Sequence, residues 1–334
     1  MPLKQMPLKQ LPAAAADRHP TFRVLGRKRG KLLRPETTTP RIVWRYALPI
    51  AVIHLLALAV CIPWLFSWTG VALLVIGTYF YGGLGINIAY HRLLTHRSFE
   101  CPLWLEHFFV LVAICCMEDA PGSWVATHRM HHNDSDERPD PHSPLVSFFW
   151  SHMGWLLVEN RDVRCLSSYD RYARDVLRDP FYLRLQRTMV PVWVYLAHAA
   201  MYFLAGLAIG LFSSGSLADG AQFGLSLLVW GVFLRTVFVW HISWSVNSLS
   251  HLYGYRTYET HENSRNNWFV ALLTSGEGWH NNHHQDPASA SNSHQWWELD
   301  PMYAIIRVLE TCGLATNVIR PRHLRRQPEK PRPR

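Results

Sequence analysis

Histidines gather in three short motifs whose spacing is suited to metal binding. His91 and His96 form an H-x-x-x-x-H motif, and two further motifs have the pattern H-x-x-H-H. One comprises His128, His131 and His132, and the other comprises His280, His283 and His284. On a helix, positions i, i+3 and i+4 share one face, so the side chains of each H-x-x-H-H motif can converge. Neutral imidazole is a ligand for iron, zinc, copper and nickel.

Eight imidazoles are more than one metal ion needs. A structural zinc ion takes four protein ligands, so the set indicates two metal ions close together. Soluble di-iron bundles combine carboxylates with paired Glu-x-x-His motifs. Here that spacing occurs at Glu277 and His280 and has no second copy among the motifs. The sequence therefore predicts a dinuclear site that is rich in histidine rather than in carboxylate.

Further residues near the motifs are candidates for the same site. Asn247 and His251 lie four residues apart at the end of an apolar segment, so they would share a helix face. Asn247 could bind a metal directly or through water. Acidic side chains could orient ligand imidazoles by accepting their second N–H group. The candidates for this role are Glu118, Asp119, Asp140 and Glu277, and His142 could assist them.

The composition indicates a membrane protein as the scaffold for these motifs. Of the 334 residues, 49% are apolar and only 17% are charged, whereas about a quarter are charged in an average soluble domain. Crossing a bilayer takes about 20 apolar residues, and four segments are long enough. They are approximately residues 42–66, 68–90, 189–212 and 222–246. The six cysteines form no C-x-x-C pair, which argues against a disulfide scaffold.

Positive charge predicts the orientation in the membrane. The net charge is +9, and basic residues gather in residues 1–40 and 319–334, which we expect to be disordered tails. Lys- and Arg-rich segments beside spans mark the cytoplasmic side, and an even number of spans places both termini there. The basic charge then faces a membrane surface rather than nucleic acid. Residues 91–188 and 247–318 form a cytosolic cap that contains every histidine motif.

Two of the expected spans continue into the motifs. The second runs without a helix breaker into His91, and the fourth stays apolar over residues 223–253. A helix of about 30 residues is about 45 Å long, which exceeds the hydrocarbon thickness, so its end should project into the cytoplasm. Residues 103–117 and 145–158 are too short to span and are expected to form interfacial or buried helices. Arg235 is expected near the cytoplasmic boundary, with its guanidinium group reaching the interface.

The residues around the motifs resemble the membrane Δ9 fatty acyl desaturases, over about residues 45–315. The resemblance rests on His91-Arg-Leu-Leu-Thr-His96, Trp124 to His132, Asp140-Pro-His142, Asn247 to His251, and Gly276-Glu-Gly-Trp-His280-Asn-Asn-His283-His284. It implies an all-α integral membrane protein, in which four transmembrane helices carry a cytosolic helical cap that holds a His-rich di-iron site. The implied iron ligands are His91, His96, His128, His131, His132, His251, His280, His283 and His284, with Asn247 contacting one iron through water.

The resemblance also implies an activity. Two iron ions (Fe2+) and O2 would introduce a cis double bond, at Δ9, into a saturated chain that is lipid-linked or CoA-linked (stearoyl-CoA-like). Acyl-CoA members carry Arg-Asp before the second motif, where this chain has Ala126 and Thr127, so a lipid-linked chain is favoured. Electrons would come from a separate ferredoxin or from a cytochrome b5-type or flavoprotein chain. The expected location is the bacterial inner membrane, with the active site on the cytoplasmic side.

Alternatives remain at this stage. Membrane hydroxylases of lipid or alkane chains share the three-motif layout, and product mass separates the two classes. A metal transporter would need ionisable ligands at bilayer depth in several spans, whereas these motifs lie outside the spans.

Trp124 and Trp155 are candidates for the walls of a substrate tunnel. Anchoring at the membrane interface is an equally good interpretation of the two tryptophans.

Overall fold

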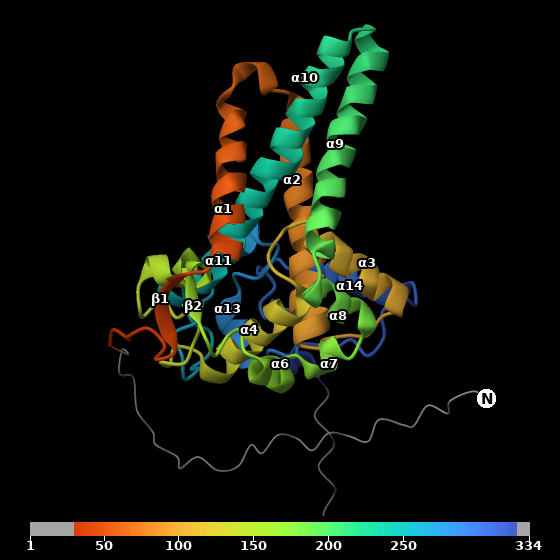
Figure 1. Cartoon of the computed structure of the whole chain (residues 1–334). Coiled ribbons are helices and arrows are strands. Elements are labelled where there is room, and N and C mark those ends of the chain that lie inside the picture. The colour runs from red at the N-terminus through yellow and green to blue at the C-terminus, as the bar shows by residue number, and fades with distance from the viewer. Residues whose placement is uncertain (1–29, 326–334) are drawn as a thin grey trace, which may run out of the picture. The chain divides into compact units, whose positions relative to one another are not determined.

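Four long apolar helices extend from one side of a layer of shorter helices (Figure 1). The computed structural model describes residues 30–325, and the unit that begins at Leu32 is described below. The four helices comprise residues Trp44–Cys61, Trp68–Thr95, Val190–Ser214 and Leu217–Leu252. Each is long and apolar enough to cross a membrane, so the protein is an integral membrane protein. The prediction of four spans is confirmed, although the first ends before Pro63 rather than at residue 66.

These helices have the following parts. The first consists of α1 (Trp44–Ala57) and the 3-10 turn η1 (Leu58–Cys61), and η2 (Pro63–Leu65) leads to the second. The second consists of α2 (Trp68–Gly77) and the π-helix η3 (Thr78–Thr95). The third is α9 (Val190–Ser214), and the fourth joins α10 (Leu217–Leu228), η5 (Val229–Leu234) and α11 (Arg235–Leu252).

The layer at the base of the long helices consists of short elements. The helices before α9 are α3 (Leu103–Ile114), α4 (Pro121–Asp134), η4 (Trp150–Gly154), α5 (Trp155–Leu157), α6 (Leu166–Tyr172), α7 (Arg174–Leu177) and α8 (Pro180–Arg187). After α11 come α12 (Trp268–Leu273), α13 (His280–Gln285), α14 (Pro301–Thr311) and η6 (Arg322–Leu324). The expected helix over 103–117 forms as α3, and the one expected over 145–158 forms over residues 148–157, after which β2 begins.

The second and fourth spans are longer than a bilayer requires. They hold 28 and 36 residues, which at about 1.5 Å per residue is about 42 Å and about 54 Å. The hydrocarbon core is about 30 Å thick. Their surplus turns carry His91, Asn247 and His251 into the layer of short helices, as the unbroken apolar pattern predicts.

Small residues allow the third and fourth spans to pack closely. A Cβ added to Gly206 would lie 2.7 Å from the Cα of Gly224, and one added to Gly210 would lie 2.8 Å from the Cα of Gly220. Within each helix the two glycines have the G-x-x-x-G spacing that lets helix backbones meet in a membrane, Gly206 with Gly210 and Gly220 with Gly224. This contact aligns α9 with α10 and so fixes the direction in which α11 enters the site.

Three expectations need correction. The fold is not purely helical, because β1 (Thr38–Ile42) pairs antiparallel with β2 (Val158–Asn160). The tails are shorter than predicted. Residues 1–29 and 326–334 lie outside the described residues. Thr38, however, already belongs to β1, and the Arg325 guanidinium group donates a hydrogen bond to the Asp286 carboxylate at 2.8 Å. Segments that contribute strands or ion pairs to the unit are not disordered.

Arg235 does not reach an interface as expected. Its side chain is fully buried between helices, where the guanidinium group donates to the carbonyl oxygen of Cys115 at 2.9 Å. It also lies 4.3 Å from the ring centroid of Tyr81. A buried charge needs such partners, since desolvation without them is costly. Arg235 therefore ties α11 to the end of α3 and to η3.

Candidate metal centre

Nine histidines gather where the two longest spans meet α4 and α13, and they form two sets. The first set contains His91, His96, His128, His132 and His283, and the second contains His131, His251, His280 and His284. Within each set, one ligand atom from every residue lies within 4.8 Å of all the others, so each set could hold a metal ion. These are the nine histidines predicted from the sequence, now divided five and four.

Each H-x-x-H-H motif contributes to both sets. On a helix, the last histidine lies about 40° to one side of the first and the middle one about 60° to the other side. In α4, His128 and His132 belong to the first set and His131 to the second. In α13 the arrangement is reversed, since His280 and His284 belong to the second set and His283 to the first. The motifs therefore do not converge on a single point but hold the two sets together.

The π-helix explains the wider spacing of the first motif. Residues five apart are brought onto one face by i→i+5 winding, whereas an α-helix would turn them about 140° apart. The His96 amide donates to the carbonyl oxygen of His91 at 3.1 Å, and their ring centroids lie 4.8 Å apart. Sequence reasoning missed this winding, although the H-x-x-x-x-H spacing itself was a signal for it.

The Nε2 atoms within each set have the spacing of metal ligands. In the first set, His283 Nε2 is 3.1 Å from His91 Nε2 and 2.9 Å from His132 Nε2. In the second set, His280 Nε2 is 3.0 Å from the Nε2 atoms of both His251 and His284. With metal–nitrogen bonds of about 2.1 Å, ligands at right angles are about 3.0 Å apart.

The protonation of the rings also suits metal ligands. Burial, reinforced by the neighbouring imidazoles, holds the pKa well below the usual value for His96, His128, His132, His280, His283 and His284. Neutral rings keep a lone pair available for a metal. The Nε2 atoms of His96 and His131 are buried and have no hydrogen-bond partner within the described residues. A cation at each set would satisfy these lone pairs.

Carboxylates hold several of the rings from behind. Glu277 Oε2 lies 2.6 Å from His91 Nδ1, and both Asp140 oxygens lie 3.0 Å from His131 Nδ1. An acceptor at Nδ1 fixes the tautomer that presents Nε2 to a metal. Burial alone would raise the pKa of Glu277, but His91 and Arg92 hold it at about 2. The pKa of Asp140 is likewise lowered by His131 against the effect of burial.

The acidic partners were only partly anticipated. Asp140 and Glu277 orient imidazoles as expected, but Glu118 and Asp119 do not, because they accept hydrogen bonds from Ser243 and Tyr46. Two partners were missed. Asp136 Oδ2 lies 3.1 Å from His251 Nδ1, and Glu262 lies 3.8 Å from both His251 and His284. Asp136 follows His132 closely in the sequence, and Glu262 follows His251, so their proximity to these histidines could have identified them.

Two cavities meet beside the histidine sets. Their empty volumes, which both include open solvent, are about 570 Å³ and about 1510 Å³. Four residues line both cavities, namely Trp124, His128, Ser243 and Asn247. The side-chain amide of Asn247 has no hydrogen-bond partner within the part of the chain that the structure describes, which leaves it available to bind water. Trp124 stacks on His128 with ring centroids 5.0 Å apart, and Trp155 lines the larger cavity.

We expect Asp140→Asn to weaken metal binding by about 10- to 100-fold, because a neutral amide oxygen is a weaker acceptor for His131 Nδ1–H than a carboxylate. Competition against a chelator of known affinity measures the change on purified protein. Asp170→Asn is the matched control, since that exposed carboxylate pairs only with Arg174 in the described residues. Equal affinities in the two variants would contradict the role given to Asp140.

Comparison with known proteins adds an independent observation. A family model described as fatty acid desaturase matches residues 62–315. The chain is 40% identical over 282 residues to an sn-1 stearoyl-lipid 9-desaturase of Anabaena variabilis, which covers 84% of this chain and 96% of the relative. It is 36% identical over 291 residues to an sn-2 palmitoyl-lipid 9-desaturase of a Nostoc species, covering 87% and 95%. An acyl-CoA 5-desaturase of Anemone leveillei is 40% identical over 266 residues, covering 80% and 76%.

Proposed function

Since the chain belongs to the fatty acid desaturase family, we propose that it inserts a cis double bond at Δ9 of a saturated, lipid-linked acyl chain. The protein is a membrane-embedded oxidoreductase of lipid metabolism. The single observation that carries the proposal is the meeting of two cavities, lined by apolar side chains and by His128, at the two histidine sets.

Two iron ions are the cofactors that we propose for the two sets. The five-histidine set would hold one, and the four-histidine set, with Asn247 through water, would hold the other. Bound there, the irons would supply the O2 activation needed to break unactivated C–H bonds, chemistry that side chains alone do not provide. In the overall reaction, two hydrogens leave adjacent chain carbons, and O2 with two electrons and two protons becomes two waters.

The residues of the chain would determine where the double bond forms. Cavity walls that include Trp124 and Ser243 would hold a methylene pair against the site, and such fixed orientation is a major contribution to catalysis. Trp155 would form part of the wall of the larger cavity, on the side of the carboxyl end of the acyl chain. Burial of the site would also keep bulk water from the reacting carbons.

The distribution of charged residues supports both the acyl carrier and the membrane location that we propose. Ala126 and Thr127 offer no charge to a CoA phosphate, and relatives that act on stearoyl-lipid and palmitoyl-lipid support a lipid-linked substrate. We place the histidine sets on the cytoplasmic side of a bacterial inner membrane, because Lys and Arg mark that side. A separate ferredoxin or a cytochrome b5-type or flavoprotein chain would supply the electrons there.

Expression in a bacterium that lacks aerobic desaturases tests the proposal. New cis monoenes with the double bond at the ninth carbon, localised by mass spectrometry in intact lipids, are the expected products. Monoenes that arise in the acyl-CoA pool before any lipid would contradict the carrier. Chains that gain one oxygen instead of losing two hydrogens would identify a hydroxylase. The donor protein is co-expressed, so that a silent result counts against the activity.

The reaction should have an alkaline limit set by Glu118. Burial raises the pKa of this carboxyl to about 8, against hydrogen bonds from Ser243 and Trp124 that favour the anion. The group is therefore neutral below about pH 8 and becomes charged in the cavity above it, so we expect activity to fall as the pH rises through 8. The same ionisation should remove stability between the unfolded and the folded pKa values, from about pH 4.5 to about pH 8.

Glu118→Gln provides the matched variant, because the amide is neutral at every pH and fills the same space. We expect it to remain active at pH 7 and to lose the decline above pH 8. A pH–rate profile of the purified enzyme with reduced donor distinguishes the two. An unchanged alkaline decline in Glu118→Gln would assign that decline to another group.

A further inference from the structure

A basic groove adjoins the larger cavity beside the first spanning helix. It is lined by Arg41, Ile42, Val43, Arg45, Glu159, Asn160, Arg161, Arg164 and Cys165, with an empty volume of about 900 Å³. Four of these residues are arginines and one is acidic, so the lining carries a net charge of about +3. Arg45 and Arg164 belong to the groove, and Arg45 also lines the larger cavity that reaches the histidines.

Two of the guanidinium groups in this groove are oriented by an aromatic ring rather than by an ion pair. No salt bridge within the described residues involves any of the four arginines, although Asp119 lies near Arg45 and Arg164, and Glu159 lines the groove. Two of them lie over the Tyr46 ring, with the guanidinium carbon 4.9 Å from the ring centroid for Arg45 and 4.4 Å for Arg164. Stacking on an aromatic face orients a cation at little cost in hydration.

The nearby carboxylates are already occupied. Asp119 accepts from the Tyr46 hydroxyl at 2.6 Å, and Glu159 accepts from the Thr39 hydroxyl at 2.7 Å. Arg164 donates to the Leu156 carbonyl oxygen at 3.3 Å, yet its Nη1 atom is buried and has no partner among the described residues. A buried donor without an acceptor is costly, so this atom indicates that an anion completes the site.

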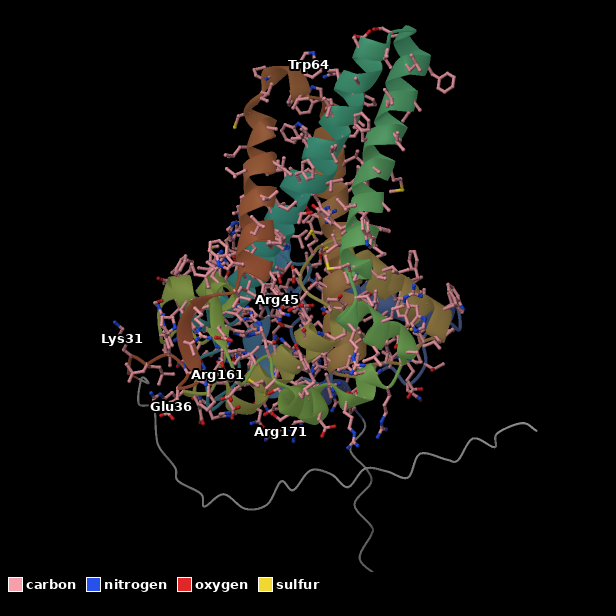
Figure 2. The ribbon with its side chains drawn as sticks, viewed as in Figure 1. Lys31, Glu36, Arg45, Trp64, Arg161 and Arg171 are labelled. Atoms are coloured by element: carbon pink, nitrogen blue, oxygen red, sulfur yellow. The ribbon has the colours of Figure 1, made fainter. Side chains whose placement is uncertain are left out.

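The groove lies where a bilayer head group would lie. Arg45 is in the first turn of α1, at the end of the spanning helix that meets the short helices, and Trp64 is at the opposite end (Figure 2). Trp44 beside it is 68% exposed, as is typical of aromatic residues at a membrane interface. A lipid could thus leave its head group among the arginines while one acyl chain enters the larger cavity.

We propose that this groove binds the phosphate of an anionic glycerophospholipid, whose acyl chain is the one to be desaturated. Guanidinium groups match phosphate oxygens in geometry as well as in charge. A neutral glycolipid could accept from Arg164 through a hydroxyl oxygen, but it would leave the net positive charge of the lining without a counter-charge. A soluble acyl-CoA also carries phosphate but does not require a site at the membrane interface. The inference rests on the proposed desaturase function and names the substrate class of that same site.

The test uses full-length enzyme, loaded with iron and reconstituted in vesicles with its electron donor. Three substrates are compared, namely distearoyl phosphatidylglycerol, distearoyl monogalactosyldiacylglycerol and stearoyl-CoA. The double variant Arg45→Gln with Arg164→Gln removes the charge, and the pair of Arg→Lys substitutions keeps it. Arg171→Gln is the control, because that exposed arginine stacks on Tyr172 and does not line the groove.

For wild-type enzyme we expect the highest kcat/KM with phosphatidylglycerol. The double glutamine variant should raise KM for that lipid by about tenfold or more and leave kcat nearly unchanged, since these groups do not touch the reacting carbons. The lysine pair should recover part of the loss, and Arg171→Gln should match wild type. Addition of phosphatidylglycerol should raise the melting temperature of wild type more than that of the double variant.

The remaining outcomes overturn the inference in distinguishable ways. An unchanged KM for phosphatidylglycerol in a folded double variant shows that the groove does not hold the head group. An equal loss with monogalactosyldiacylglycerol shows that the arginines act through the fold. Preference for stearoyl-CoA with the same arginine dependence assigns the groove to a soluble thioester. If wild type desaturates none of the three substrates, the proposed function itself fails.

Discussion

His131→Ala is expected to abolish double-bond formation while the protein still inserts into the membrane. The substitution removes one of the four imidazoles of the second set and leaves Asp140 without the ring that it faces at 3.0 Å. With a ligand missing, the second metal ion should be lost first. Expression in the desaturase-deficient bacterium, with fatty acid analysis, measures the product, and metal analysis of the purified variant measures the loss of the ion.

His107→Ala is the matched control for that experiment. His107 contacts Asp179 at 2.9 Å and belongs to neither set, so activity and metal content should both remain near wild type. Normal monoene production by a folded His131→Ala variant would contradict the assignment of His131 to the site. A comparable loss in His107→Ala would instead indicate that removing a histidine outside the two sets also damages the protein, so that the loss in His131→Ala would not identify a metal ligand.

Val246→Trp should reduce desaturation of 18-carbon chains by about 5- to 100-fold while metal binding is retained. Val246 lines the smaller cavity and not the larger one, so an indole there would occupy space that the methyl end of the chain needs. Overpacking typically costs about 1–3 kcal/mol, and each 1.36 kcal/mol of lost transition-state stabilisation is about a tenfold change in rate. The loss should be smaller for shorter acyl chains, whose methyl ends do not reach as far.

Competition between 14- and 18-carbon substrates within one reaction measures this selectivity. Val75→Trp serves as the control, because Val75 is 52% exposed on a spanning helix and lines neither of the two cavities beside the histidines. Wild-type selectivity in a folded, metal-loaded Val246→Trp variant would show that the smaller cavity does not receive the acyl chain.

The spans and the histidine sites were largely predictable because each has a strong local pattern. Four apolar segments identify the long helices, and the absence of a breaker before His91 and His251 predicts that two of them extend past the membrane. The i, i+3, i+4 spacing correctly placed the motif histidines near one another. The same spacing could not predict the five-and-four division, which depends on how α4 and α13 face each other.

The remaining features depend on contacts between distant parts of the chain. The pairing of Thr38 with Asn160 brings together residues that no local pattern relates, whereas the π-winding of η3 had a local signal in the five-residue spacing of His91 and His96. Glu118 and Asp140 look equivalent in sequence, yet only Asp140 meets an imidazole, while Glu118 bonds Ser243 across 125 residues. Burial of Arg235 likewise follows from the packing of α11 against α3 and η3, which the apolar pattern of a single helix does not reveal.

Iron content and turnover, measured together on one purified sample, test the dinuclear desaturase site most directly. Protein from iron-replete cells is analysed for metal per chain and then given reduced donor, O2 and a stearoyl-lipid. We expect about two irons per chain, one for each histidine set, and formation of the cis monoene in proportion to iron content. Full activity in a sample that holds one metal ion per chain, or none, would contradict the two-metal site.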